Sequence, residues 1–117
     1  MKLLVAVDGS SEADDALAHA TDIADATNGS ITVAYAVDPA IYDVGGSAPV
    51  SSLSDAERRL LVEDVEDAEN RGLDVLEEAA ALAAELGQDV ETELLYGDPV
   101  VAITDYAESE GVDVIYV

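Results

Sequence analysis

Hydrophobic and polar positions change their period several times along this chain, and each change marks a predicted element. Three mainly apolar runs, at residues 3–7, 31–37 and 112–117, are rich in valine and isoleucine, which is typical of strands buried on both faces. A fourth run, residues 90–96, alternates at first between apolar and polar positions. This alternation predicts a strand at the edge of a sheet, partly open to water.

Between these runs the apolar residues recur at intervals of three and four, which predicts helices at residues 11–27, 55–86 and 99–110. The first helix should turn one stripe toward the core: Ala13, Ala16, Leu17, Ala20, Ile23, Ala24 and Thr27. Its start resembles a capping box of Ser11 and Asp14, and the second helix starts with the capping box of Ser54 and Glu57. The third helix follows the N-cap residue Asp98 and has a proline at its first position.

The long second helix carries Gly72 on its apolar stripe. A glycine there costs helix stability of about 1 kcal/mol relative to alanine. We therefore expect that the missing side chain lets this helix approach the sheet closely.

The order of the predicted elements is β-α-β-α-β-α-β. Right-handed crossovers then give a three-layer α/β fold, a parallel open sheet with helices on both faces, as one domain over residues 1–117. The strand ends at Asp8, Asp38, Gly97 and Val117 should share one rim of the sheet. Residues 38–54, rich in Gly, Pro and Ser, read as a long loop that is either a functional cover or a mobile connection.

The charge is unusual, because 27 acidic residues face four basic ones and the formal net charge is -23. Self-repulsion of this size is screened at molar salt, so we interpret the chain as a halophilic protein of a salty cytoplasm. Nucleic acid is disfavoured as a partner, because only Lys2, Arg58, Arg59 and Arg71 could neutralise phosphates. The absence of a signal peptide and of a long apolar run predicts a soluble cytoplasmic protein without a membrane segment.

Several kinds of site are excluded by the sequence. The chain has no cysteine, no P-loop lysine motif, no G-x-G-x-x-G after the first strand, no G-x-S-x-G and no zinc pattern. Its one histidine, His19, shares a helix face with Asp15 and Asp22, so we interpret it as a solvated residue and not as a catalytic base. The acidic run at residues 63–69 is interpreted as a solvated helix face and not as a metal site.

The turn after the first strand, Asp8-Gly9-Ser10-Ser11, is the leading place for a ligand, because open parallel sheets bind ligands beyond the carboxyl ends of their strands. A receiver domain shares the order of elements. It would also need a late lysine, which this chain lacks, although Asp8 and Asp98 are present.

The opening LLVAVDGSSEADDALAHATDIA, the strand ending AYAVDP and the segment GDPVVAITDYAESEGVDVIYV together resemble the universal stress protein family over the whole chain. The resemblance implies an adenine nucleotide alpha-hydrolase-like sheet of order 3-2-1-4-5, often dimeric, with an ATP site in one branch. By position, Ala6, Val7 and Asp8 would line the nucleotide, with Asp8 near the ribose or a metal-bound phosphate. Ala36 and Val37 would approach the adenine, and Val117 would close the pocket. From the residues alone, Asp8 could instead serve only as a cap of the following helix.

Members of the family that bind ATP carry G-x2-G-x9-G-[S/T] just after the fourth strand, and the sequence ends before that position. We therefore expect a domain without its C-terminal part and its fifth strand, with weak or absent binding of ATP and Mg²⁺. The leading hypothesis is a regulatory protein of the stress response that responds to adenine nucleotide and is not an enzyme. The alternatives are a dimerisation or interaction module of the same fold that binds no nucleotide, and a slow ATP hydrolase.

Overall fold

The structure is a computed structural model that describes the backbone of residues 1–38 and 55–116 and the side chains of 1–38 and 65–116. The elements follow the predicted order, and their bounds are β1 (Lys2–Ala6), α1 (Ser11–Thr27), β2 (Ser30–Val37), α2 (Asp55–Glu85), β3 (Val90–Tyr96), α3 (Pro99–Glu110) and β4 (Val114–Tyr116). The loop at residues 39–54, including the predicted cap at Ser54, lies outside the described residues, as does Val117.

The described strands form one sheet in the order β3-β2-β1-β4. All three pairings are parallel. β1 lies between β2 and β4, with Leu3 opposite Ile31 on one side and Val114 on the other. The predicted fold class and strand order 3-2-1-4 are thereby confirmed. The edge position predicted for residues 90–96 is confirmed as well, because among the described strands β3 pairs only with β2.

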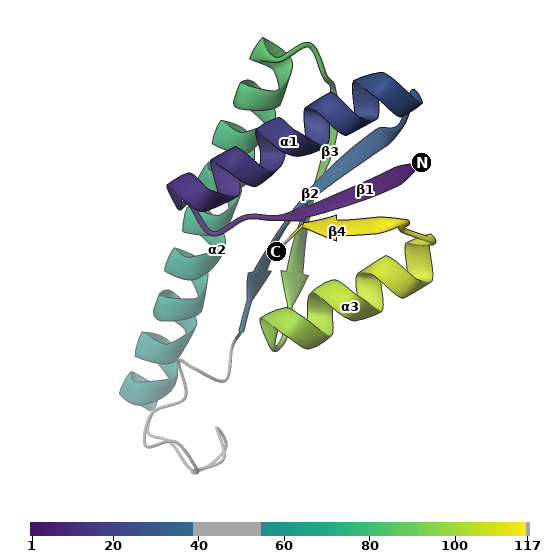
Figure 1. The fold of residues 1–117 in the computed structure, drawn as a ribbon. Coiled ribbons are helices and arrows are strands. Elements are labelled where there is room, and N and C mark those ends of the chain that lie inside the picture. The colour runs from purple at the N-terminus through teal and green to yellow at the C-terminus, as the bar shows by residue number, and fades with distance from the viewer. Residues whose placement is uncertain (39–54, 117) are drawn as a thin grey trace.

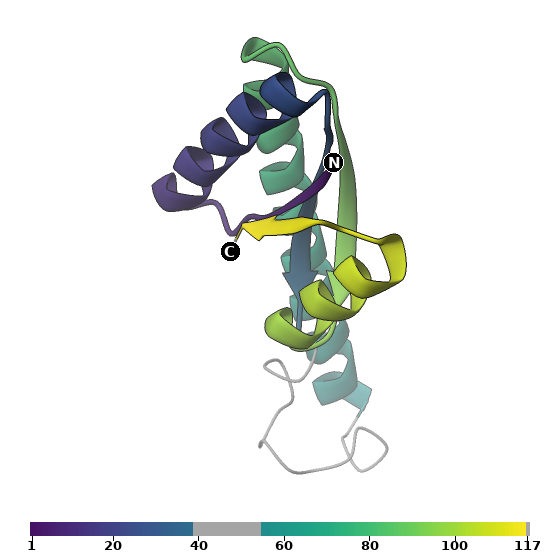
Figure 2. The same cartoon turned by 45° about the vertical axis from the view of Figure 1, so that its right-hand side comes forward.

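Helices cover both faces of the sheet (Figure 1). The turned view in Figure 2 shows α1 and α2 on one side of the strands and α3 on the other. Each face has its own core. The first packs the strands against α1 and α2 around Leu3, Val5, Leu17, Val33, Leu76 and Ala83. The second is smaller and packs Leu4 and Ala34 against Ile103 and Ala107 of α3.

Three local expectations differ from the structure. The N-cap of α1 is Ser10 and not Ser11, because the chain turns at Gly9 and the Ser10 hydroxyl accepts from the Ala13 backbone N–H at 3.2 Å. Thr27 is exposed and its hydroxyl donates to the Ile23 carbonyl at 2.7 Å, so the buried stripe of α1 ends at Ala24. The last predicted strand begins at Val114 and not at residue 112.

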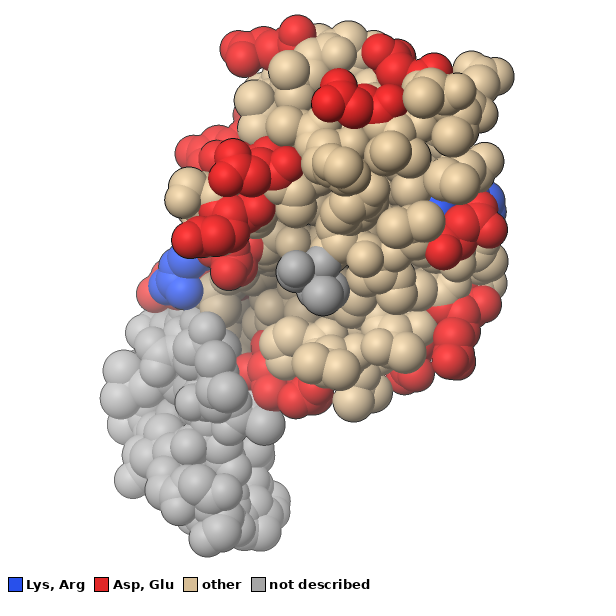
Figure 3. Space-filling model, viewed as in Figure 1, with Lys and Arg blue, Asp and Glu red and all other residues tan. Residues whose placement is uncertain are grey.

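Acidic side chains dominate the charged surface (Figure 3). They follow α2 and the outer rims of the face shown, and leave an uncharged band over the middle of the molecule. Within the described residues, no helix is both long enough and apolar enough to pass through a bilayer.

Candidate functional site

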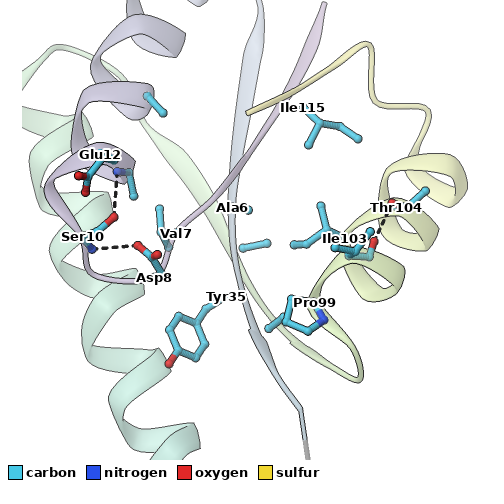
Figure 4. A pocket seen from close by; sticks show the side chains of 15 residues that line it. Ala6, Val7, Asp8, Ser10, Glu12, Tyr35, Pro99, Ile103, Thr104 and Ile115 are labelled. Carbon is cyan, nitrogen blue, oxygen red and sulfur yellow. Dashed lines mark hydrogen bonds between the residues drawn. The ribbon is translucent and has the colours of Figure 1, made fainter. Parts of the chain in front are cut away.

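A cavity of about 580 Å³ opens at the carboxyl ends of β1 and β2. Its floor is formed by Ala6, Ala34 and Ala36 of these strands and by Val7, which directly follows β1. One wall comes from the first turns of α1 and the other from the first turns of α3, with Ile115 of β4 closing one side (Figure 4). The volume lies within the range of about 300–1,000 Å³ typical of small-molecule sites.

The α1 wall begins with a tight turn that the sequence encodes. Gly9 has φ +85°, a conformation that other residues rarely adopt, and so it reverses the chain directly after Asp8. The Asp8 Oδ1 accepts a hydrogen bond from the Ser10 backbone N–H at 2.9 Å. Asp8 therefore stabilises the turn, while Ser10 caps the helix, and the carboxylate of Asp8 stays at the edge of the cavity.

The same turn shifts the acidity of Asp8. Hydrogen bonds from the Ser10 side chain and then from the Ser10 backbone N–H lower the pKa of the carboxyl below its ordinary value, against a smaller opposing effect of desolvation. Asp8 is therefore an anion at neutral pH, with an oxygen available as a hydrogen-bond acceptor.

The α3 wall is built by a cap of the same kind. Asp98 Oδ1 accepts from the backbone N–H groups of Val100 and Val101 at 3.1 and 3.2 Å, and Pro99 occupies the first turn. This start directs Ile103 and Thr104 toward the cavity, one helical turn apart from Pro99 and Val100. The Thr104 hydroxyl donates to the Val100 carbonyl at 2.7 Å, which leaves its oxygen able to accept.

Four of the six residues predicted for the site line the cavity: Ala6, Val7, Asp8 and Ala36. Val37 is only 2% exposed and is not among the lining residues; its carbonyl accepts from the Gly97 N–H at 2.8 Å and ties β2 to the end of β3. Val117 lies outside the described residues. The contacts of these residues with a ligand remain a prediction.

Sequence reasoning did not place several further lining residues at the site, among them Glu12, Tyr35, Ile103, Thr104 and Ile115. Ile103 belongs to the small core between α3 and the sheet, and its position in the first turns of α3 also brings it to the cavity. Ile115 faces α3, whereas Val114 and Tyr116 face α1 and α2. The sequence does not indicate this orientation, because the strand is mainly apolar and lacks an alternating pattern.

The lining combines a mainly apolar surface with a few hydrogen-bonding groups on both walls. Alanine methyls and the side chains of Ile103 and Ile115 provide the apolar part, and Asp8, Ser10 and Thr104 provide hydrogen-bonding groups. Among the described residues no group of three or more His, Asp or Glu side chains is placed to hold a metal ion. The exposed His19 does not line the cavity, and its ring meets that of Tyr116 edge to face at a centroid distance of 5.7 Å.

A parallel open sheet with helices on both faces and a cavity beyond the carboxyl ends of its central strands defines a doubly wound α/β domain. The model of the universal stress protein family matches residues 1–117, so the chain belongs to this family. No curated protein matches the chain.

Solved structures show the same fold. The universal stress protein UspA from Lactobacillus plantarum is 27% identical with a TM-score of 0.77, over 98% of this chain and 74% of that one. A universal stress protein solved in complex with cAMP is 24% identical with a TM-score of 0.64, over 98% of this chain and 73% of the other. The universal stress protein from Archaeoglobus fulgidus, in complex with dAMP, is 23% identical with a TM-score of 0.64, over 98% of this chain and 78% of the other.

Proposed function

We propose that this chain is a regulatory protein of the universal stress type that binds an adenine nucleotide in the cavity at the ends of β1 and β2. One observation supports this most strongly. β1 lies between β2 and β4, and the chain crosses to β2 over one face through α1 but reaches β4 over the other face through α3. The cavity therefore lies at the topological switch point of the sheet, where open α/β folds bind nucleotides.

The lining supports an assignment of the two ends of the ligand. The adenine ring would lie against the alanine residues of the floor, between Ala36 and Ile103. Asp8, at the Gly9 turn, would accept hydrogen bonds from ribose hydroxyls. Two solved proteins of the same fold were determined with adenine nucleotides, cAMP and dAMP, which agrees with this class of ligand.

The residues fit the phosphates less well than the nucleoside. Asp8 and Glu12 are the charged residues of the lining and both are acidic, so phosphates would meet mainly the first-turn amides of α1. Asp8 would be the residue to hold a bound Mg²⁺, which would supply positive charge to offset the repulsion of the phosphates. We therefore propose that ATP binds only weakly, together with Mg²⁺.

We favour regulation over catalysis because the described lining contains no histidine, cysteine or lysine to act as base or nucleophile. Occupancy of the cavity by nucleotide would then be the signal, in a cytoplasmic protein. A slow ATP hydrolase is the less favoured form of the same proposal.

The test is to purify the protein in 2 M KCl with Mg²⁺, denature it and analyse the released nucleotide. Release of an adenine compound in near-stoichiometric amount supports the proposal, and an empty protein that also fails to bind added adenosine, AMP and ATP overturns it. Incubation with labelled ATP tests hydrolysis separately. If the bound ATP is released without being cleaved, the hydrolase is excluded but the proposal of nucleotide binding stands.

A second function, a homodimeric interaction module that binds no nucleotide, is favoured by one feature. In the described sheet β4 pairs only with β1, and Ile115 on it is 39% exposed. Sedimentation velocity at 0.2 and 2 M KCl would show a dimer directly. A dimer with an empty cavity would favour this module, whereas a nucleotide-bound protein of either size would favour the proposal above.

A further inference from the structure

The charges around the cavity have one sign. Asp8 and Glu12 line it, and the described lining includes no lysine, arginine or histidine. Glu12 and Asp14 also occupy the first turn of α1, so the positive end of this helix dipole already faces carboxylates of its own chain.

The basic residues whose side chains the structure describes, Lys2 and Arg71, do not change this picture. Lys2 lies at the opposite end of β1, and its Nζ donates to the Glu110 carbonyl at 2.9 Å. Arg71 is exposed on α2 and is not part of the lining, and the side chains of Arg58 and Arg59 lie outside the described residues. The formal net charge of -23 adds a general repulsion of anions to the local one.

Phosphate groups are therefore the part of an adenine nucleotide that this cavity binds least favourably. Adenosine is uncharged, a terminal phosphate adds up to about two negative charges, and each further phosphate adds more. Two charges about 8 Å apart in water change binding by roughly a factor of two, and ATP would meet several such pairs at once. The apolar floor, in contrast, contributes equally to all three compounds.

We propose, on the basis of the function proposed above, that the cavity selects its adenine ligand by low negative charge and binds an adenine nucleoside or nucleoside monophosphate in preference to ATP. The preference has an unusual dependence on salt. Salt weakens the binding of an anion to a basic site, but here it screens repulsion, so it strengthens the binding of an anionic ligand. The affinity for ATP should rise steeply between 0.2 and 2 M KCl, while the affinity for adenosine should change little.

Isothermal titration of the 117-residue protein with adenosine, AMP and ATP, each with EDTA and with Mg²⁺, measures this preference. We expect ATP without Mg²⁺ to bind at least about tenfold more weakly than adenosine at 0.2 M KCl, with the gap narrowing at 2 M KCl and with Mg²⁺. Binding of ATP as tight as or tighter than adenosine at 0.2 M KCl would overturn the charge selection and leave the proposed function intact. Binding of none of the three would overturn both.

A variant tests whether the wall charge is responsible. Glu12→Gln removes one negative charge from the cavity, and relative to the affinity for adenosine it should raise the affinity for AMP about twofold and that for ATP more. Glu108→Gln is the matched control, because Glu108 is exposed in the last turn of α3 and does not line the cavity. Equal effects of the two variants on ATP, or a Glu12→Gln variant with unchanged affinities for AMP and ATP, would contradict the role of the wall charge.

Discussion

The ring of Tyr35 fills the space that a side chain on Gly72 would need. A Cβ atom placed on Gly72 would lie 2.6 Å from Tyr35 Cδ1 and 2.9 Å from Leu94 Cδ1, closer than real contacts allow. α2 therefore lies directly on β2 and β3, as the position of Gly72 on the apolar stripe predicted. Because Tyr35 also lines the cavity, this contact joins the packing of α2 to the wall of the site.

Gly72→Ala should destabilise the protein even though alanine favours helices. Overpacking costs typically 1–3 kcal/mol, and the gain of about 1 kcal/mol in helix propensity offsets part of it, so we expect a net loss of about 1 kcal/mol. Urea unfolding measures this loss. Asn70→Ala, at an exposed position of the same helix, is the control and should leave the free energy of unfolding within about 0.5 kcal/mol. A Gly72→Ala protein more stable than the wild type would contradict the close approach.

The fold was predictable because its information is local. The Gly9 and Gly111 turns, the Asp98-Pro99 start and the change from continuous to periodic apolar patterns mark the elements, and right-handed crossovers leave few possible sheets. The N-cap was misplaced by one residue, since Ser10 and Ser11 both suit a cap and only the geometry after Gly9 decides between them.

The candidate site was predictable in part. Asp8 follows from the end of the first strand, which the sequence marks, and Ala36 was placed by the resemblance to the family. Thr104 and Ile115 depend on how α3 and β4 are rotated about their axes. The contact between His19 and Tyr116 was also missed, because it joins α1 to β4 across residues far apart in the chain. Such contacts depend on tertiary placement, which no local pattern contains.

The carboxyl of Asp8 should titrate below the ordinary range of aspartate. Its folded-state pKa is lowered, so its contribution to stability is present above the unfolded-state pKa of about 4 and is lost as pH falls through the lower folded-state value. NMR titration of the Asp8 carboxyl carbon measures the shift. Ser10→Ala should bring the pKa of Asp8 back toward the ordinary value, because the Ser10 side chain is its main cause. An unchanged pKa in that variant would refute this assignment.

Stability should increase with salt. Twenty-seven carboxylates against four basic residues repel one another in dilute buffer, and at 1 M salt the Debye length falls to about 3 Å. Thermal unfolding followed by circular dichroism from 0.1 to 2 M KCl should show a rising midpoint, where each 1 kcal/mol of stabilisation corresponds to roughly 4–8 °C. Midpoints that stay flat over this range would contradict the halophilic interpretation.

A larger side chain on the cavity floor should block the ligand without unfolding the domain. Ala36 is partly exposed and lines the cavity, so Ala36→Leu fills space that the adenine would occupy, and we expect adenosine binding to fall at least about tenfold. Ala26→Leu, on the exposed last turn of α1, is the control and should bind adenosine as the wild type does. Retention of full affinity by Ala36→Leu, with normal circular dichroism, would place the ligand elsewhere.

The most direct test of the account is an NMR titration of the methyl-labelled protein with adenosine in 2 M KCl. The account predicts saturable shifts, and nuclear Overhauser contacts to the adenine protons, at the methyl groups of Ala6, Ala36, Ile103 and Ile115, with little change at Leu76 and Ala83 in the core below α2. Saturable shifts confined to residues outside the cavity, or no saturable shift at any methyl group, would contradict the assignment of the cavity as the adenine site.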